Sequence, residues 1–233
     1  MKKRVWELDF IRGGAILIMI GIHLVVDLML AGKLEYIESS FFWFVKLYGG
    51  IIFVIISGIC AEFSKNNFKR GLVVFGCGML LTIATAALYK LGICPEGILI
   101  QWGVLHLIGF SMMIYPLYKK LPWPAALLLA LAILALGYYF RAEVWTTNPY
   151  LLPLGIEPIA FKTRDWYPIL PNTGWFMLGS LLSKLIYKEK KSLFPNGPEK
   201  NIIIRLFSWV GRNSLWIYLI SQPLTYITAN YLM

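Results

Sequence analysis

The chain has 233 residues, of which 58% are hydrophobic and 15% are charged, and its formal net charge at neutral pH is +10. A water-soluble domain of this length cannot bury so much apolar surface, which argues against the soluble classes of enzyme and binding protein. The positive charge does not indicate a nucleic-acid partner, because the basic residues cluster in alternate loops between apolar runs. Composition therefore predicts a polytopic membrane protein.

Seven apolar stretches approach the length of about 20 residues that crosses a bilayer core. We predict spanning helices at about residues 9–31, 41–64, 70–90, 99–118, 123–140, 169–187 and 213–232. A short amphipathic helix at 201–210, ended by Gly211, is expected to lie in the membrane interface, and Asn213 is expected to cap the last span. The predicted fold is an all-α transmembrane helical bundle that forms one domain over residues 1–233.

The loop charges predict the orientation of this bundle. The apolar run after Met1-Lys2-Lys3-Arg4 is too long for a signal peptide and has no clean cleavage site, so we expect it to be retained. One set of loops holds Lys2, Lys3, Arg4, Lys65, Lys69, Arg70, Lys119, Lys120, Lys188, Lys190, Lys191 and Lys200, and the other holds Lys33, Lys90, Arg141, Lys162 and Arg164. Because cytoplasmic loops carry the excess of Lys and Arg, the N-terminus is predicted to be cytoplasmic, the C-terminus and the aromatic segment 141–168 extracytoplasmic, and the location the cell membrane.

Metal and disulfide chemistry is not indicated. The three cysteines are Cys60, Cys77 and Cys94, two of them in apolar helices, and no Cys-x-x-Cys pair occurs. No cluster of carboxylates or thiolates suggests a metal site. Two membrane histidines can ligate a haem, but the helices carry no second histidine pair.

Ionisable residues mark the first predicted span. Asp9 and Arg12 stand at its beginning, His23 lies roughly 16 Å further along an α-helix, and Asp27 follows one turn later. Such groups are costly at membrane depth and indicate a functional site. A carboxylate one turn from an imidazole can orient it and raise the basicity of its second nitrogen, which is the arrangement of a general base.

The second histidine of the chain, His106, is expected at a similar depth to His23, because the fourth span runs from the outside inwards. Two histidines from non-adjacent helices would then converge on one layer. The alternative is that each histidine hydrogen-bonds a neighbouring helix and serves only packing. Asp27 beside His23 favours catalytic roles for His23, His106 and Asp27, with the packing alternative left open.

Cations gather at the predicted cytoplasmic ends of the spans. Arg12 and Arg212 lie just inside apolar segments, and Lys69 and Arg70 open the third span. Together such side chains can hold phosphate groups. The alternative is that each one only enforces topology or extends to the interface.

Three further residues are candidates for substrate contacts. Asn172 lies near the start of the sixth span and Gln222 lies within the last one. Trp166 belongs to the outer aromatic segment, where most aromatic residues form an interfacial belt and some can stack on sugar rings. Nearby Ser and Thr residues are expected to satisfy their own helices.

Four motifs, in order along the chain, resemble a known family. They are LDFIRGGA at residues 8–15 with His23 on the same helix, GVLHLIG at 103–109, PILP at 168–171 and GRNSLWIYL at 211–219. The set resembles the transmembrane acyltransferase superfamily, and within it the bacterial relatives of heparan-α-glucosaminide N-acetyltransferase, over nearly the whole chain.

The resemblance implies an acyl-CoA donor on the cytoplasmic side, an acceptor that is usually a sugar on the far side, and a tunnel that brings them together. It also implies His23 as a catalytic residue and a homodimer as a plausible assembly. Relatives often carry a histidine before the Gln-Pro of the last helix, where this chain has Ser221.

We therefore predict an acyltransferase that moves an acetyl group from acetyl-CoA to a hydroxyl or amine of an extracytoplasmic sugar or glycan. His23, oriented by Asp27, is the predicted base, and His106 is predicted to bind the acceptor or stabilise the oxyanion. One rival is a transporter or flippase for a small solute or glycolipid, which would use buried His and Asp as a proton relay. Another rival is a non-catalytic subunit of an envelope assembly.

Overall fold

A computed structural model describes residues 5–158, 163, 165–194 and 201–232 of the chain. The contacts divide the chain into two compact units: unit 1 comprises Met1–Ile56 and Tyr187–Met233, and unit 2 comprises Ser57–Ile186. The basic start Met1–Arg4 and the basic residues Lys162, Arg164 and Lys200 lie outside the described residues. The expectation of a single domain over residues 1–233 stays a prediction.

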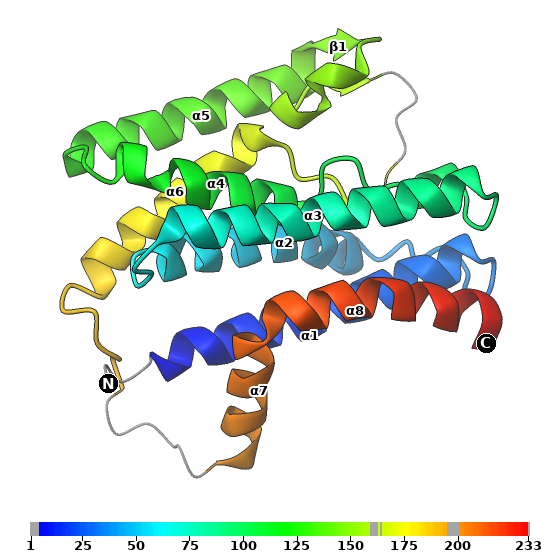
Figure 1. Cartoon of the computed structure of the whole chain (residues 1–233), viewed down its shortest axis with the longest axis horizontal. Coiled ribbons are helices and arrows are strands. Elements are labelled where there is room, and N and C mark those ends of the chain that lie inside the picture. Colours follow the sequence, from blue (N-terminus) through cyan, green and yellow to red (C-terminus); the bar gives the residue numbers. More distant parts are fainter. Residues whose placement is uncertain (1–4, 159–162, 164, 195–200, 233) are drawn as a thin grey trace. The chain divides into compact units, whose positions relative to one another are not determined.

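Unit 1 consists of helices from both ends of the chain (Figure 1). It holds α1 (Trp6–Leu30), most of α2 (Ser40–Ala61), α7 (Ile202–Arg212), α8 (Ser214–Ile227) and a π-helical turn, η3 (Thr228–Leu232). α1 and α8 run alongside each other, whereas α7 crosses their direction near the beginning of α1. α1 ends where Gly32 takes up a positive φ of 69°, a conformation that costs glycine little.

Close backbone contact holds α7 against α1. A Cβ atom on Gly13 would meet the carbonyl oxygen of Phe207, and one on Gly211 would meet the carbonyl oxygen of Asp9. The Phe10 and Phe207 rings stack beside this contact with centroids 5.2 Å apart. Two glycines thus let the helices approach to backbone distance, as small residues do between membrane helices.

Unit 2 is formed by the middle of the chain. It holds the end of α2, α3 (Asn67–Lys90), the 3₁₀ turn η1 (Glu96–Ile98), α4 (Val104–Tyr118), α5 (Trp123–Glu143), β1 (Trp145–Thr146), the 3₁₀ helix η2 (Pro149–Leu154), β2 (Glu157–Pro158) and α6 (Ile169–Ile186). β1 and β2 pair in parallel, with Trp145 opposite Glu157. Near the beginning of α6 the Leu170–Pro171 peptide is cis.

Small residues also join the helices of unit 2 in pairs. A Cβ atom on Gly71 of α3 would lie 2.7 Å from the carbonyl oxygen of Gly109 in α4. A Cβ atom on Gly137 of α5 would lie 2.5 Å from the backbone of Pro171 in α6. Each pair therefore packs backbone against backbone, α3 on α4 and α5 on α6.

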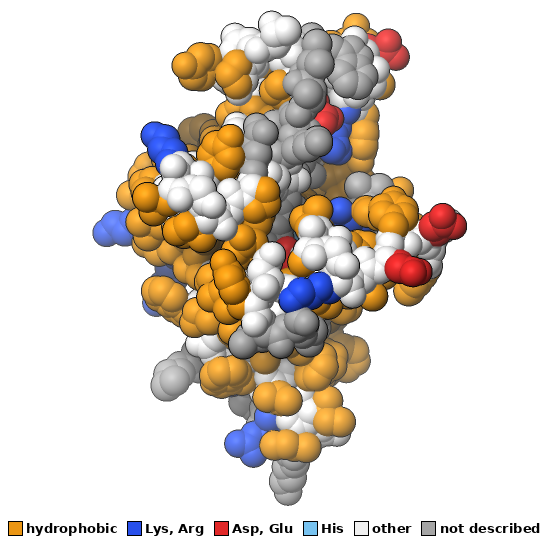
Figure 2. Space-filling model, turned by 90° about the vertical axis from the view of Figure 1, so that its right-hand side faces the viewer, with side chains coloured by type: hydrophobic (Ala, Val, Ile, Leu, Met, Phe, Trp, Pro, Cys, Tyr) orange, Lys and Arg blue, Asp and Glu red, His pale blue; other side chains and the backbone are white. Residues whose placement is uncertain are grey.

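The surface and the helix lengths are those of a membrane protein. In the described part of the chain, four helices, α1, α2, α3 and α5, are long and apolar enough to cross a membrane, and α4 is apolar but shorter. Apolar side chains are exposed over much of the face seen in Figure 2. In water so much exposed apolar surface would favour aggregation, whereas lipid tails cover it at no cost. The all-α membrane fold is confirmed, and the count of seven spans stays a prediction.

Two predicted helix ends were wrong. The fourth helix begins at Val104 rather than at 99, because residues 101–103 form a turn in which Gly103 is extended. α7 continues through Gly211 to Arg212, and the Asn213 side chain does not cap α8 but donates to the carbonyl of Trp209 in α7 (2.9 Å). Gly211 serves the close contact with α1 and does not end the helix.

Candidate functional site

The first predicted site residue, His23, meets a residue from the other end of the chain. The amide nitrogen of Gln222 in α8 lies 3.0 Å from His23 Nδ1 in α1. The Tyr218 ring, one turn earlier on α8, approaches the imidazole edge to face with centroids 6.3 Å apart. Gln222 and Tyr218 are buried, with 6% and 2% of their surfaces exposed. The imidazole is therefore held at Nδ1 and along one face.

Asp27 lies one turn beyond His23 on the same helix and is 2% exposed. A helix places residues four apart on one face, so Asp27 belongs to the same side of α1 as His23. In the described part of unit 1, Gln222 and Tyr218 of α8 thus contact His23 of α1, and Asp27 lies one turn further along α1. Three of these four were singled out as site residues from the sequence, and Tyr218 lies within the motif GRNSLWIYL at 211–219.

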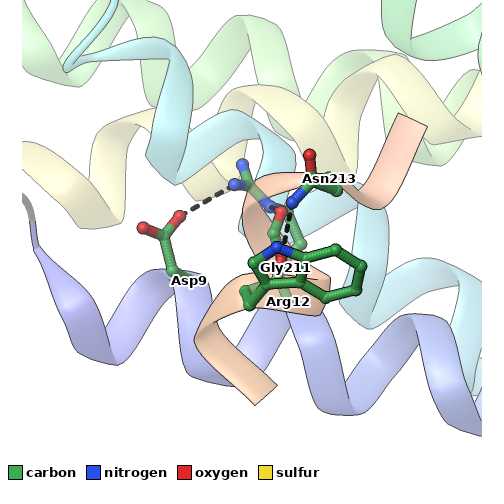
Figure 3. Close-up of polar contacts among 5 residues, drawn as sticks. Asp9, Arg12, Gly211 and Asn213 are labelled. Carbon is green, nitrogen blue, oxygen red and sulfur yellow. Dashed lines mark hydrogen bonds and ion pairs between the residues drawn. The ribbon is translucent and has the colours of Figure 1, made fainter. Parts of the chain in front are cut away.

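Arg12 contacts both α1 and α7 within unit 1 (Figure 3). Its Nη2 pairs with Asp9 Oδ1 at 2.8 Å, one turn back on α1, and its Nε donates to the carbonyl oxygen of Gly211 at 2.6 Å. Gly211 lies in the last turn of α7, where carbonyl groups lack helical partners and a cation is favoured. Arg12 thus connects α1 to the end of α7, and Arg212 stands beside this connection with its side chain exposed.

His106 in unit 2 has both ring nitrogens engaged by nearby residues. Its Nδ1 accepts from the backbone N–H of Gly103 (3.1 Å), and its Nε2 lies 3.3 Å from Thr82 Oγ1. The single Thr82 hydroxyl proton goes to the Ile100 carbonyl (2.7 Å), so the hydroxyl oxygen accepts from His106 Nε2–H. This pattern fixes a neutral imidazole protonated at Nε2.

The surroundings of His106 leave it little freedom. It is 1% exposed, Trp102 stacks on it with centroids 5.3 Å apart, and the Phe75 ring meets it edge to face at 5.5 Å. A Cβ atom on Gly78 of α3 would lie 2.9 Å from its Nδ1. For His106 this geometry supports the packing alternative that the sequence left open. Because His23 belongs to unit 1 and His106 to unit 2, their convergence stays a prediction.

Asp165 was not singled out from the sequence, yet it caps α4. The backbone N–H of Val104 donates to its carboxylate at 3.1 and 3.3 Å, and the side chain is 3% exposed. Gly103, at the N-cap position, has no side chain to satisfy the free N–H groups of the first turn. The lack of a capping side chain at Gly103 could have indicated from the sequence that another residue caps α4. Only the fold shows that this residue is Asp165.

The two predicted substrate-contact residues of unit 2 form hydrogen bonds to nearby backbone carbonyls. Asn172 Nδ2 donates to the Pro168 carbonyl (3.0 Å), and Trp166 Nε1 donates to the Leu152 carbonyl (3.2 Å) with Arg141 over its ring at 5.3 Å. These bonds order the segment before α6.

Lys69 and Arg70 are exposed on the first turn of α3. This turn is capped by Asn66, whose side-chain oxygen accepts from the Lys69 N–H (2.9 Å). Cations at this end of a helix face the unpaired N–H groups, where an anion is favoured. The geometry is thus compatible with a phosphate contact, which stays a prediction.

A buried acid of unit 2 also escaped notice in the sequence. Glu62 follows the apolar run of α2, is 5% exposed, and has Lys184 Nζ at 3.9 Å and the Tyr115 hydroxyl beside it. An acid directly after about 20 apolar residues was the available signal. Among the described residues, no group of three or more His, Cys, Asp or Glu is placed to hold a metal ion.

Comparison with known proteins defines the family. The sequence matches the family model described as heparan-α-glucosaminide N-acetyltransferase, catalytic, over residues 4–223. No curated protein and no solved structure matches the chain. The match covers both units, including the His23 and His106 helices. The chain therefore belongs to the membrane acetyltransferase family represented by the catalytic domain of heparan-α-glucosaminide N-acetyltransferase.

Proposed function

We propose that this protein is a multi-pass enzyme of the cell membrane that transfers an acetyl group from cytoplasmic acetyl-CoA to a hydroxyl or amine of an extracytoplasmic sugar or glycan. Family membership supports acetyl transfer. The single observation that carries the proposed chemistry is the contact between His23 and Gln222, which draws together two helices from opposite ends of the chain. Ionisable side chains within membrane helices are costly and by default indicate a functional site.

In this proposal His23 is the general base. An amide can present either its N–H or its carbonyl oxygen to a ring nitrogen. When Gln222 presents its oxygen, it accepts from Nδ1–H of His23, and the lone pair on Nε2 is left to take a proton. The buried carboxylate of Asp27, on the same face of α1, then stabilises the imidazolium that forms.

The transfer balances as follows. The acceptor oxygen or nitrogen attacks the thioester carbonyl carbon while His23 Nε2 takes its proton, and the C–S bond then breaks. The electron pair of that bond leaves with the CoA sulfur, which receives the proton from His23. A route through an acetyl-imidazole on His23 uses the same residues.

The proposed donor contacts are cations. Arg212 in unit 1 and Lys69 and Arg70 in unit 2 are exposed, and each is proposed to meet a donor phosphate. Arg12, whose Nε and Nη2 bind Gly211 and Asp9, is proposed to keep the end of α7 in place beside Arg212. On the acceptor side we propose Trp166 as a stacking surface and Asn172 as a nearby polar group. His106, with both nitrogens engaged, is proposed to position the start of α4.

The test is an acetyl-transfer assay with the purified chain in nanodiscs, radiolabelled acetyl-CoA and glucosamine-containing oligosaccharides as acceptors. We expect label on the acceptor and one CoA thiol released for each acetyl moved. Replacing His23 by Ala is expected to lower kcat by roughly a hundredfold to ten-thousandfold, the usual contribution of a general base. The melting temperature of His23→Ala serves as the control for folding. A folded His23→Ala variant that transfers acetyl at the wild-type rate would overturn the assignment.

A further inference from the structure

α7 has an apolar face that the proposed acetyl transfer does not use. Phe207 and Gly211 face α1, while Ile202, Leu206 and Trp209 follow one another on the other side of the helix at spacings of four and three residues. Their exposed fractions are 71%, 56% and 53%. An exposed stripe of this kind needs an apolar neighbour.

The direction of α7 indicates where that neighbour lies. α1 is long and apolar enough to cross a membrane, and α7 crosses the direction of α1 and α8 close to the first turns of α1 (Figure 1). A helix placed across a spanning helix at its end runs along the membrane plane, at the level where the span enters the bilayer. There the apolar stripe meets the boundary between headgroups and acyl chains, where Trp side chains are favoured.

A second segment is fastened to the same end of α1. Glu7 accepts from the Ser192 hydroxyl and from the Leu193 N–H, both at 2.8 Å, and Trp6 Nε1 donates to the Phe194 carbonyl (3.1 Å). Leu193 and Phe194 are nevertheless 49% and 58% exposed. These hydrogen bonds hold residues 192–194 at the beginning of α1. α7 packs against the same end of α1.

The charge at this end of unit 1 is mainly positive. Among the described residues, the exposed basic side chains here include Lys188, Lys190 and Lys191 in the segment before α7, and Arg205 and Arg212 on α7. The acid nearest to them in the chain, Glu189, is paired with Lys191 at 2.8 Å. Arg205 lies one turn before Trp209, at the edge of the apolar stripe. Apolar and basic groups bordering each other in this way match a layer of anionic lipid headgroups above acyl chains.

We propose that α7 together with residues 188–194 forms a lipid-docking surface that binds anionic phospholipid headgroups. Ile202, Leu206 and Trp209 enter the outer edge of the acyl region, and Arg205 binds headgroup phosphate. The basic loops predict that this end of α1 lies on the cytoplasmic side. The negative surface potential of the cytoplasmic leaflet then adds to the attraction. The lipid-docking surface concerns binding alone and does not depend on acetyl transfer.

The test uses Trp209 as its own probe. The full chain is placed in bilayers that contain brominated phosphatidylglycerol or brominated phosphatidylcholine, and fluorescence quenching is compared between the wild type and Trp209→Phe, so that the difference reports Trp209. We expect Trp209 to be quenched by both lipids and the relative association constant to favour phosphatidylglycerol. Arg205→Gln is expected to lower that preference about fivefold, the contribution of one basic residue near an anionic leaflet.

Lys33→Gln is the matched control, because Lys33 is an exposed cation of unit 1 just beyond the other end of α1. It is expected to leave the lipid preference unchanged. The proposal would be overturned if Trp209 escaped quenching by both lipids, or if Arg205→Gln and Lys33→Gln gave the same preference as the wild type. Since no acetyl transfer is measured, failure here leaves the proposed enzyme activity standing, and the reverse also holds.

Discussion

At the scale of single residues, His23 and His106 differ in the hydrogen-bond partners of their ring nitrogens. His23 is engaged at Nδ1 by an amide that can serve either tautomer, whereas His106 has both nitrogens fixed by Gly103 and Thr82. A base needs one nitrogen that exchanges protons, and a capping histidine needs both to be constant. We therefore propose two roles for the same residue type, a base for His23 and a positioning residue for His106.

Gln222 tests this distinction, because we expect it to act through His23. Gln222→Ala removes one hydrogen bond and is expected to lower kcat roughly tenfold while the KM for the acceptor stays unchanged. Gln222→Glu should restore much of the rate, since a carboxylate accepts from Nδ1–H as the amide oxygen does. Steady-state kinetics of both variants provide the measurement. A rise in KM with kcat unchanged would instead assign Gln222 to acceptor binding.

At the scale of elements, glycines decide which helices approach most closely. Gly13 of α1 lies against the Phe207 carbonyl of α7, and Gly58 of α2 lies against the Phe176 carbonyl of α6. Each of these two glycines therefore lets a pair of helices approach to backbone contact. Gly49 of α2, by contrast, has open space within 4 Å of the position that a Cβ atom would occupy, and so plays no such part.

Neighbouring glycines of α1 provide a matched pair. Gly13→Ala is expected to lower the free energy of unfolding by about 1–3 kcal/mol, because the new methyl group meets the Phe207 carbonyl and forces the helices apart. Gly14→Ala places its methyl group 3.8 Å from the Phe207 ring, an ordinary contact, and is expected to be neutral or to stabilise by up to about 1 kcal/mol. Thermal or denaturant unfolding in detergent compares the two. Equal effects would show that the α1–α7 contact is looser than described.

At the scale of the whole molecule, charge asymmetry predicts how the chain sits in the membrane. Four helices meet the length and hydropathy of a span, while α4, α6 and α8 have 15, 18 and 14 residues. A short helix can still cross where neighbouring structure continues it, as η3 continues α8. The predicted topology of seven spans therefore needs a direct measurement.

Labelling of single cysteines in inverted and right-side-out vesicles tests this topology. Cys60, Cys77 and Cys94 are first replaced, and Lys33→Cys and Lys190→Cys are then introduced separately at exposed positions. We expect an impermeant maleimide to label Lys33→Cys only from the outside and Lys190→Cys only from the cytoplasmic side, because basic loops remain inside. Permeabilised vesicles provide the control. Labelling of both positions from one side would contradict the predicted orientation.

The sequence by itself determined the membrane class, the all-α fold and the family. Apolar runs of about 20 residues are too long and too numerous to be buried outside a membrane. The four motifs that identify the family are read from residue order alone, so they do not depend on how the helices pack. Tertiary structure decided which groups meet: Gln222 with His23, Arg12 with Gly211, and Asp165 with the open end of α4. These partners lie 199, 199 and 61 residues apart. The spacing of residues along one helix predicts contacts within that helix. Contacts between distant helices depend instead on how closely their backbones approach. At the α1–α7 contact Gly13 and Gly211 allow that approach, and only the packed structure shows that these two helices meet.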